Sequence, residues 1–331
     1  MPSPNLQAAR IVAGTLTLLS REIREVGHPV DLWSPALPQD SIRDMAAMVG
    51  RGAAVPLWVD ERHPAKGLAL YHRSDWESEF LGFEAARILG PFMVVENQLE
   101  RETRVRRLAN LAIEQSRIRD HYLITIKTFH DPAVLRGFLG ENFVMAEIGT
   151  SLTGTVPEEA LTAERPAGFV VLEDDDVSEL AADTVEALGD FFYDGHWRND
   201  RVPGPEKARL LWSQVALEDL TGKADPALLL WDQRRGRPAA ISTVRISGQL
   251  AFLSILAVAA PYRGRGLGRL IMHETLNRLR GRVGEIKVET ASYNLPALKL
   301  YHSLGFVNTA PLAALHYHRQ AGLSSRPSRP E

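Results

Sequence analysis

The sequence contains no cysteine among its 331 residues. This absence excludes disulfide bonds, thiolate metal sites and a cysteine nucleophile, and it is compatible with a reducing compartment. The chain also lacks an apolar run long enough to span a bilayer. Its N-terminal apolar run, residues 8–19, is interrupted by Arg10 and makes a poor signal peptide. We therefore expect a cytoplasmic protein without a membrane partner.

A strong charge of either sign is also missing, because 38 Lys and Arg face 41 Asp and Glu, for a net charge of −3. This balance gives no overall attraction to nucleic acid, so we expect no nucleic-acid partner and anion binding only at local basic loops. A hydrophobic content of 45% supports real cores. The length is sufficient for two domains of ordinary size.

The strongest local motif lies in residues 255–268, where an apolar run reaches Pro261 and continues into a loop with Arg263, Arg265 and the glycines Gly264, Gly266 and Gly268. A helix is expected from about Arg269. Glycine allows positive φ and a close approach of the backbone to a ligand. Free N–H groups in such a turn and the start of the next helix attract anions, and arginine adds charge-assisted donors. The stretch indicates a diphosphate-binding loop.

Spacing separates the known phosphate motifs. A dinucleotide fingerprint needs G-x-G-x-x-G/A, but the sixth position counted from Gly264 or Gly266 is an arginine or an isoleucine, and the Gly-Lys-Ser/Thr of a P-loop is absent. The pattern R-x-x-G-x-G remains, at Arg263, Gly266 and Gly268. In this motif the sequence resembles the GNAT superfamily of acyl-CoA-dependent N-acetyltransferases. A glycine-rich turn without a ligand is the alternative.

A second motif lies downstream, where Asn294, Ala297 and Tyr301 stand in a stretch that is similar to the family pattern N-x-x-A followed by L-Y-x-x-x-G-F. The resemblance implies that acetyl-CoA is the co-substrate and that Tyr301 protonates the departing sulfur, which suits a phenol with a pKa near ~10. It also implies that the N–H of Val258, on a strand edge that parts from its neighbour, stabilises the thioester oxygen. The implied coenzyme-binding residues are Leu256, Ala257, Val258, Arg263, Gly264, Arg265, Gly266, Leu267, Gly268, Asn294, Ala297 and Tyr301. Tyr301 as a half-buried aromatic and Asn294 as a simple helix cap are the alternatives.

A general base is not identified by the sequence. Glu289 lies on a predicted strand near the reaction centre, but its direction depends on register. His316 and His318 alternate with Tyr317 on the last strand, where a histidine is more often structural. The acidic run 173–176 suits a helix N-terminus better than a metal site. We expect no metal.

The order of predicted elements alternates strands and helices through both halves. Strands are expected at 55–60, 67–72, 85–96, 121–128, 143–152, 168–172, 227–231, 239–246, before the glycine loop, at 285–291 and at 306–318. Helices are expected at 5–27, 40–49, 102–117, after 131, at 177–192 and 204–221, after the glycine loop to 280 and after 294.

The sequence indicates an internal repeat of the two halves, with a chance alignment of helix–strand–helix–strand stretches as the alternative. A shift of 163 residues pairs Phe143 with Phe306, Asp131 with Asn294, and Phe138 with Tyr301. In the first half the shift places Glu100 to Val105, without a glycine, on the glycine loop. We therefore predict an α/β fold of tandem GNAT-like units, each a mixed, mostly antiparallel sheet flanked by helices, the N-terminal one degenerate. The predicted boundaries are 1–153 for the degenerate domain, 154–166 for a linker, 167–319 for the catalytic domain and 320–331 for a disordered tail.

The acceptor is indicated by weaker motifs. Residues 76–83, the pair 191–192 and residues 207–212 resemble the dTDP-fucosamine (dTDP-4-amino-4,6-dideoxygalactose) acetyltransferase group, which implies a nucleotide-linked amino sugar. Arg198 could pair with its phosphates and Trp197 could stack on it, with Glu289 as a further substrate-side candidate. A GNAT enzyme for another amine (antibiotic, amino acid or protein N-terminus) and a non-catalytic acyl-CoA-binding regulator are the alternatives. A homodimer is left open.

Overall fold

The computed structural model describes residues 3–26, 39–95, 97–162, 164–173, 176–180, 196–200 and 204–319, without the side chains of 22–26, 39–40, 196 and 204–206. The chain forms two compact units, Met1–Ile148 with Leu312–Glu331 (unit 1) and Gly149–Pro311 (unit 2). Among the described residues no helix has both the length and the apolar character that crossing a membrane requires.

Unit 1 is built around a mixed sheet. Its helices are α1 (Pro4–Val26), α2 (Gln39–Gly50), α3 (Asp75–Leu81), α4 (Gln98–Ile118) and α5 (Pro132–Leu139), with a 3-10 turn at Pro64–Lys66. Its strands are β1 (Ala54–Trp58), β2 (Leu68–Arg73), β3 (Ala85–Phe92), β4 (Leu123–Phe129), the start of β5 (Val144–Thr155) and the end of β11 (Val307–His318). β1, β2 and β3 are antiparallel, β3 and β4 are parallel, and β4 is antiparallel to residues 312–318 of β11.

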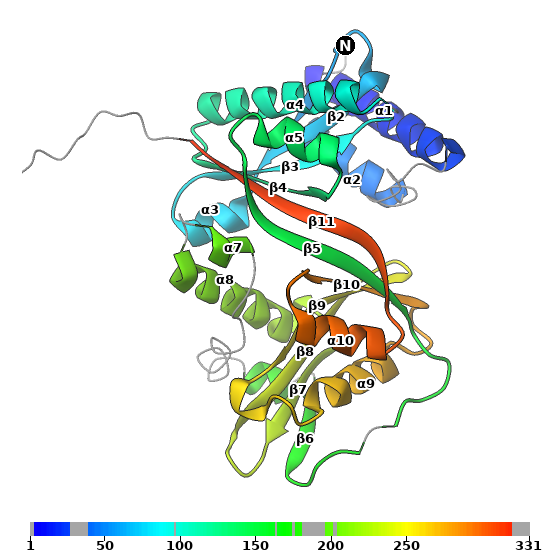
Figure 1. The fold of residues 1–331 in the computed structure, drawn as a ribbon, viewed down its shortest axis with the longest axis vertical. Coiled ribbons are helices and arrows are strands. Elements are labelled where there is room, and N and C mark those ends of the chain that lie inside the picture. The colour runs from blue at the N-terminus through cyan, green and yellow to red at the C-terminus, as the bar shows by residue number, and fades with distance from the viewer. Residues whose placement is uncertain are drawn as a thin grey trace, which may run out of the picture. The chain divides into compact units, whose positions relative to one another are not determined.

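Helices cover both faces of the unit 1 sheet because β2 is apolar on both sides. Leu68 and Leu70 pack with apolar residues of α1 and α2, whereas Ala69 and Tyr71 face α4 and α5 in the opposite cluster. In Figure 1, α4 and α5 lie side by side. Helices α1 and α2 therefore complete the core of unit 1.

Unit 2 carries the glycine loop. Its elements are β6 (Phe169–Glu173), α7 (His196–Asn199), α8 (Gly204–Glu218), a π-helical turn Asp219–Lys223, β7 (Ala227–Asp232), β8 (Arg237–Ser247), β9 (Leu250–Val258), a 3-10 turn Ala260–Tyr262, α9 (Leu267–Leu279), β10 (Glu285–Ala291) and α10 (Leu295–Ser303). Strands β6 to β9 are antiparallel in sequence order, β9 and β10 are parallel, and β10 is antiparallel to residues 149–155 of β5.

Helices α9 and α10, both labelled in the lower part of Figure 1, share one apolar cluster with β9 and β10 of unit 2. Tyr301 of α10 lies in this cluster against Phe306, whose ring occupies the space above Gly154 of β5. A Cβ on Gly154 would lie 2.7 Å from that ring, so the glycine permits the contact.

The predicted α/β class with mostly antiparallel sheets is confirmed. Some elements differ from the sequence-based expectation. β5 continues through Thr155, into the segment expected to be a linker, and β11 from Leu312 groups with unit 1 rather than with the second half. Helices α3 and α7 were not predicted. Of the predicted helix 177–192 only the start is described, within 176–180, and the tail 320–331 lies outside the described residues.

Candidate active site

The two strands that flank the candidate site part from each other. β9 pairs with β8 along its whole length, but it pairs with β10 only through Phe252, opposite Lys287. β10 continues alongside β5 as far as Ala291. From residue 253 onward, β9 therefore has an unpaired edge on its β10 side, as the resemblance implied.

The hydrogen-bond alternation of β9 aims two amides at this edge. The N–H of Ala259 donates to the carbonyl of Ala239 at 2.9 Å, which makes these residues a hydrogen-bonded pair. The next pair, Val258 opposite Ala240, is then non-hydrogen-bonded, and so is Leu256 two residues earlier. The N–H and C=O groups of Val258 and Leu256 therefore point away from β8, toward the side from which β10 has departed. Between them, Ala257 uses its backbone groups for β8.

The glycine loop follows directly. Gly264 and Gly266 have φ values of +75° and +77°, in the left-handed region where residues with a Cβ are strained. No atom lies within 4 Å of the position that a Cβ would take on either one. Gly266 caps α9, and the first N–H that returns to it is that of Leu270, at 3.1 Å. The N–H groups of the first turn, from Leu267 and Gly268 onward, thus lack carbonyl partners in the helix and form an anion-binding end.

Gly268 has a different task, because its φ is ordinary. A Cβ there would lie 3.3 Å from Leu300 Cδ2 and 3.6 Å from Val258 Cγ2. The glycine therefore lets the start of α9 approach both α10 and the end of β9, which brings the helix N-terminus close to the parted strands.

The two arginines of the loop are exposed but oriented differently. Arg263 Nε donates to the carbonyl of Val258 at 3.0 Å and so ties the loop to the strand end. The guanidinium of Arg265 lies 5.8 Å from the ring centre of Tyr262. Both are within the loop that the sequence singled out.

Asn294 is the N-cap of α10. Its Oδ1 accepts from the N–H of Ala297 at 3.4 Å, and its Nδ2 donates to Thr290 Oγ1 at 3.1 Å. The cap that the sequence analysis gave as an alternative is therefore present. It fixes the start of α10 beside the end of β10, and a role toward the coenzyme stays a prediction.

Tyr301 is 4% exposed, and its ring centre lies 5.5 Å from that of Phe306. Burial raises the pKa of the Tyr301 hydroxyl above its ordinary value, because the phenolate would lose its hydration. The hydroxyl is accordingly protonated throughout the neutral range. This is the protonation state that a proton donor needs.

The acceptor-side candidates are placed by α7 and β10. Trp197 is 2% exposed, which favours a packing role that anchors α7 over stacking on a substrate. Arg198 is half-buried. Asn199 Nδ2 donates to the hydroxyl of Tyr293 at 3.1 Å and so links α7 to the turn after β10. Nothing in the sequence marked Asn199 or Tyr293, because the contact joins residues 94 positions apart.

Glu289 now has a defined direction. Its neighbour Val288 packs with α9 and α10, so alternation along the strand turns the half-buried Glu289 side chain to the opposite face of the sheet. That face is the one on which Thr243 of β8 donates to Asp219 beyond α8. A base on this face would approach the parted strands from the side opposite Tyr301.

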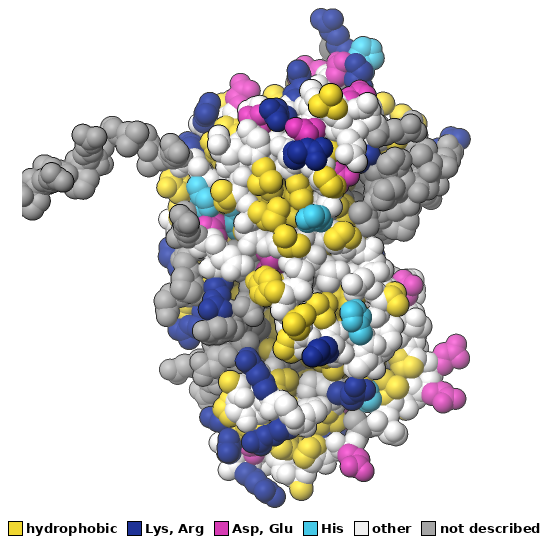
Figure 2. Space-filling model, in the orientation of Figure 1, with side chains coloured by type: hydrophobic (Ala, Val, Ile, Leu, Met, Phe, Trp, Pro, Cys, Tyr) yellow, Lys and Arg dark blue, Asp and Glu magenta, His cyan; other side chains and the backbone are white. Residues whose placement is uncertain are grey.

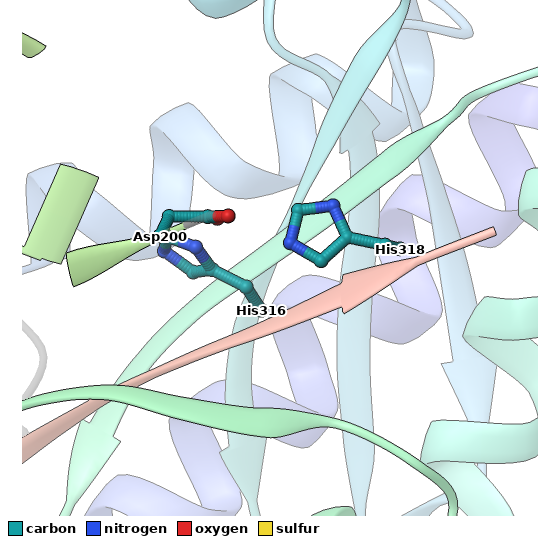
Figure 3. A group of neighbouring side chains, drawn as sticks. All are labelled: Asp200, His316 and His318. Atoms are coloured by element: carbon teal, nitrogen blue, oxygen red, sulfur yellow. The ribbon is translucent and has the colours of Figure 1, made fainter. Parts of the chain in front are cut away.

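His316 and His318 lie on the part of β11 that belongs to unit 1, and Figure 3 shows both rings on the same side of the strand. Their ring centres are 6.3 Å apart, and His316 is fully buried. Figure 3 also labels Asp200, a residue of unit 2 that is 6% exposed.

Comparisons with known proteins find similar sequences and folds. Residues 189–306 match the model of the acetyltransferase (GNAT) family. Over 111 residues the chain is 33% identical to the mycothiol acetyltransferase of Kineococcus radiotolerans, covering 32% of this chain and 35% of that protein. The match thus spans about a third of the relative's length.

Two solved structures share the fold at low identity. A GCN5-related N-acetyltransferase from Sphaerobacter thermophilus has a TM-score of 0.55 and 15% identity, over 82% of this chain and 85% of its own. A tandem GNAT protein from the clavulanic acid biosynthesis pathway has a TM-score of 0.52 and 15% identity, over 83% and 87%. Residues 189–306 are therefore similar to the GNAT acetyltransferase family, and the fold of the chain is like that of these two structures.

Proposed function

We propose that this protein is an N-acetyltransferase that moves the acetyl group of acetyl-CoA to a primary amine by direct transfer in a ternary complex. The observation that carries the proposal is the pair of outward-facing amides at Leu256 and Val258, set between a glycine-capped helix N-terminus and a buried, protonated Tyr301. Separately, each feature is common. Together they offer donors for a diphosphate, for an amide-containing arm and for a thioester oxygen.

The roles follow from the chemistry of each group. The N–H groups at the start of α9, with Arg263 and Arg265, bind the diphosphate. The backbone of residues 256–258 holds the pantetheine arm, and the Val258 N–H stabilises the oxyanion that forms when the amine attacks the carbonyl carbon. When the carbon–sulfur bond breaks, Tyr301 donates its proton to the leaving thiolate. Asn294 and Ala297 line the coenzyme at the start of α10.

For the acceptor we propose a nucleotide-linked amino sugar. The support is the resemblance in residues 207–212 and the half-buried Arg198 on α7, a charge that suits a phosphate-bearing ligand. Glu289 is the substrate-side carboxylate whose direction suits a base, since it faces the side opposite Tyr301. Transfer in the manner of the mycothiol acetyltransferase relative is a second candidate, favoured by the 33% identity over 111 residues. A regulator that binds acyl-CoA without turnover is the third.

A thiol-release assay tests the proposal. The purified protein is mixed with acetyl-CoA and one amine at a time: nucleotide-linked 4-amino sugars, amino-sugar glycosides without phosphate, small polyamines and short peptides. We expect release of free coenzyme thiol only with an amine, and fastest with the nucleotide sugars. Turnover of polyamines or peptides alone would contradict the sugar assignment, and binding of acetyl-CoA without turnover of any amine would favour the regulator.

A further inference from the structure

Three arginines surround one buried tyrosine beside the glycine loop. The guanidinium carbons of Arg235, Arg237 and Arg265 lie 5.6, 5.4 and 5.8 Å from the ring centre of Tyr262. Arg235 lies in the turn between β7 and β8, Arg237 is the first residue of β8, and Arg265 comes from the glycine loop itself. Because all three are exposed while the ring is 1% exposed, the tyrosine is a fixed platform for three surface cations.

A buried hydrogen-bond chain holds that platform in place. Tyr262 donates to Asp232 Oδ2 at 2.8 Å and accepts from Arg237 Nε at 3.2 Å. Asp232 Oδ1 accepts the backbone N–H groups of Arg234 and Arg235 at 3.0 and 3.2 Å, which shapes the β7–β8 turn. Burial opposes ionisation of Asp232, but the bonds from Tyr262 and the turn outweigh it and lower its pKa, so the carboxylate is charged at neutral pH.

Asp232 is the carboxylate that the described contacts place beside this group. Asp232 is 6% exposed and directs its oxygens at the turn and at Tyr262, and its approach to Arg235 Nε is long, at 3.9 Å. Arg235, Arg237 and Arg265 are themselves exposed. Figure 2 shows Lys and Arg side chains gathered over the part of unit 2 where the turn between β7 and β8 lies in Figure 1. Three exposed guanidinium groups around one buried ring favour a multiply charged anion.

We propose that Arg235, Arg237 and Arg265 form a second anion site that binds a phosphate monoester, next to the loop assigned to the diphosphate. Its assignment to a ligand rests on the proposed function. A dianionic phosphate could come from the 3′-phosphate of the coenzyme or from a phosphate on the acceptor. Arg265 links the two sites, because it lies between Gly264 and Gly266 and also against Tyr262.

Calorimetry with two coenzymes distinguishes the sources. CoA and dephospho-CoA, which lacks the 3′-phosphate, are titrated into the unaltered protein, into Arg235→Gln/Arg237→Gln, and into Arg235→Gln alone, which spares the bond to Tyr262. The matched control is Arg234→Gln. It removes the same charge from the same turn, but the Arg234 side chain lies against Gly168, where a Cβ would be 3.0 Å from its Nε. Melting temperatures verify that each variant folds.

If the site takes the coenzyme's phosphate, the unaltered protein binds CoA about tenfold more tightly than dephospho-CoA. The double variant then loses this preference and Arg235→Gln alone reduces it. Arg234→Gln keeps it. In a second arm, inorganic phosphate is titrated into protein saturated with CoA. If the coenzymes bind equally but phosphate heat is present and lost in the double variant, the site serves the acceptor.

The proposal is overturned by a coenzyme preference that survives in the double variant. It is also overturned if the two coenzymes bind equally and the phosphate titration gives no heat. The same holds if the coenzymes bind equally and the double variant gives the same phosphate heat as the unaltered protein. Should neither coenzyme bind, the proposed function fails. The arginine site is then tested by phosphate titration of the free protein, where the double variant must bind more weakly than Arg234→Gln.

Discussion

Units 1 and 2 each place a pair of aromatic rings at the same position of the fold, but they differ at the start of the neighbouring long helix, which is α4 in unit 1 and α9 in unit 2. The rings of Phe138 and Phe143 in unit 1 are 5.1 Å apart, and those of Tyr301 and Phe306 in unit 2 are 5.5 Å apart. A shift of 163 residues relates the two pairs. The repeat deduced from the sequence therefore extends to side-chain packing.

The start of the long helix is the first difference. In unit 2 the loop runs to Gly266 and α9 begins at Leu267. In unit 1 the position equivalent to Leu267 is Arg104, but α4 begins six residues earlier, at Gln98, where Asn97 Oδ1 accepts the N–H of Glu100 at 3.0 Å. The backbone N–H groups of unit 1 that correspond to the first turn of α9 therefore lie inside α4, where they donate to helix carbonyls. Unit 1 has no anion-binding turn at this position.

The second difference is a buried arginine. Arg101 is 6% exposed, its Nε donates to the carbonyl of Val95 at 3.1 Å and its NH1 donates to Asp131 Oδ2 at 2.6 Å. Val95 and Asp131 are the counterparts of Val258 and Asn294. In unit 2 the exposed Arg263 donates from its Nε to the carbonyl of Val258. The guanidinium of unit 1 thus spans the two positions between which unit 2 is proposed to hold its coenzyme.

The third difference is which of the two packed helices carries the glycine at their contact. In unit 2 the small residue is Gly268 of α9, packed on Leu300 of α10. In unit 1 the small residue is Gly137 of α5, packed on Val105 of α4, at the same two positions. The crossing of the two helices is kept while the glycine has moved to the other helix. The absence of glycine at this position of α4 is therefore compensated by Gly137 of α5, which keeps the helix contact close.

Exchange of the aromatic hydroxyl between the units gives the largest expected effect. Tyr301→Phe removes the proton donor, so we expect kcat to fall by about 10²- to 10⁴-fold while the Kd for acetyl-CoA is unchanged. The matched Phe138→Tyr adds a hydroxyl to the fully buried core of unit 1. It should cost about 1–3 kcal/mol of unfolding free energy and gain no activity. Unchanged turnover in Tyr301→Phe would remove the acid role.

Replacing Arg101 of unit 1 and Arg263 of unit 2 should separate an effect on the free energy of unfolding from an effect on the binding of acetyl-CoA. Arg101→Gln leaves Asp131 and the Val95 carbonyl without their buried partner, so we expect a loss of about 3 kcal/mol in denaturant unfolding and the same Kd for acetyl-CoA. Arg263→Gln, at an exposed position, should leave the unfolding free energy nearly unchanged and weaken acetyl-CoA about tenfold. The opposite outcome for the pair would mean that unit 1 holds the coenzyme.

Gly137→Ala tests whether the glycine of α5 is needed for the contact between α4 and α5. The new Cβ would lie 2.6 Å from Val105 Cγ1, so we expect a loss of about 1–3 kcal/mol in unfolding free energy. Val105→Ala in the same chain should restore part of this loss, because removing the methyl groups of Val105 makes room for the new Cβ. Gly268→Ala in unit 2 should cost less, because the nearest atom is the flexible end of Leu300 at 3.3 Å. If the double variant is no more stable than Gly137→Ala, the packing account fails.

The pH dependence should show the smallest change. Burial raises the pKa of Tyr301, and the form that donates is the protonated one, so alkali up to about pH 10 leaves the acid intact. We expect kcat to rise with pH as the acceptor amine loses its proton and to show no descending limb below pH 10. A descending limb near pH 9 that Tyr301→Phe abolishes would contradict the raised pKa.

Local spacing was sufficient to predict much of this molecule. The glycine loop, the cap at Asn294 and the order of strands and helices along the chain each depend on residues that lie close together in the sequence. Contacts between distant residues were not visible. The Asn199–Tyr293 bond, the Tyr262–Asp232 bond and the return of β11 to unit 1 join segments that only the fold brings together.

The burial of Trp197 illustrates the same limit. An aromatic residue next to an arginine in a polar loop is typical of a ligand platform, and only the packing of α7 shows that this ring is enclosed. Arg101 is the reverse case, because an arginine in a charged helix is expected to be solvated. Its burial depends on Val95 and Asp131, which lie 6 and 30 positions away.

Isothermal titration of the full chain with acetyl-CoA tests most directly whether only unit 2 holds the coenzyme. We expect one molecule bound per chain, and we expect Gly266→Val, which strains the left-handed N-cap of α9 and fills the open space above it, to abolish the heat. Two molecules per chain, or a single molecule still bound by Gly266→Val, would contradict the account.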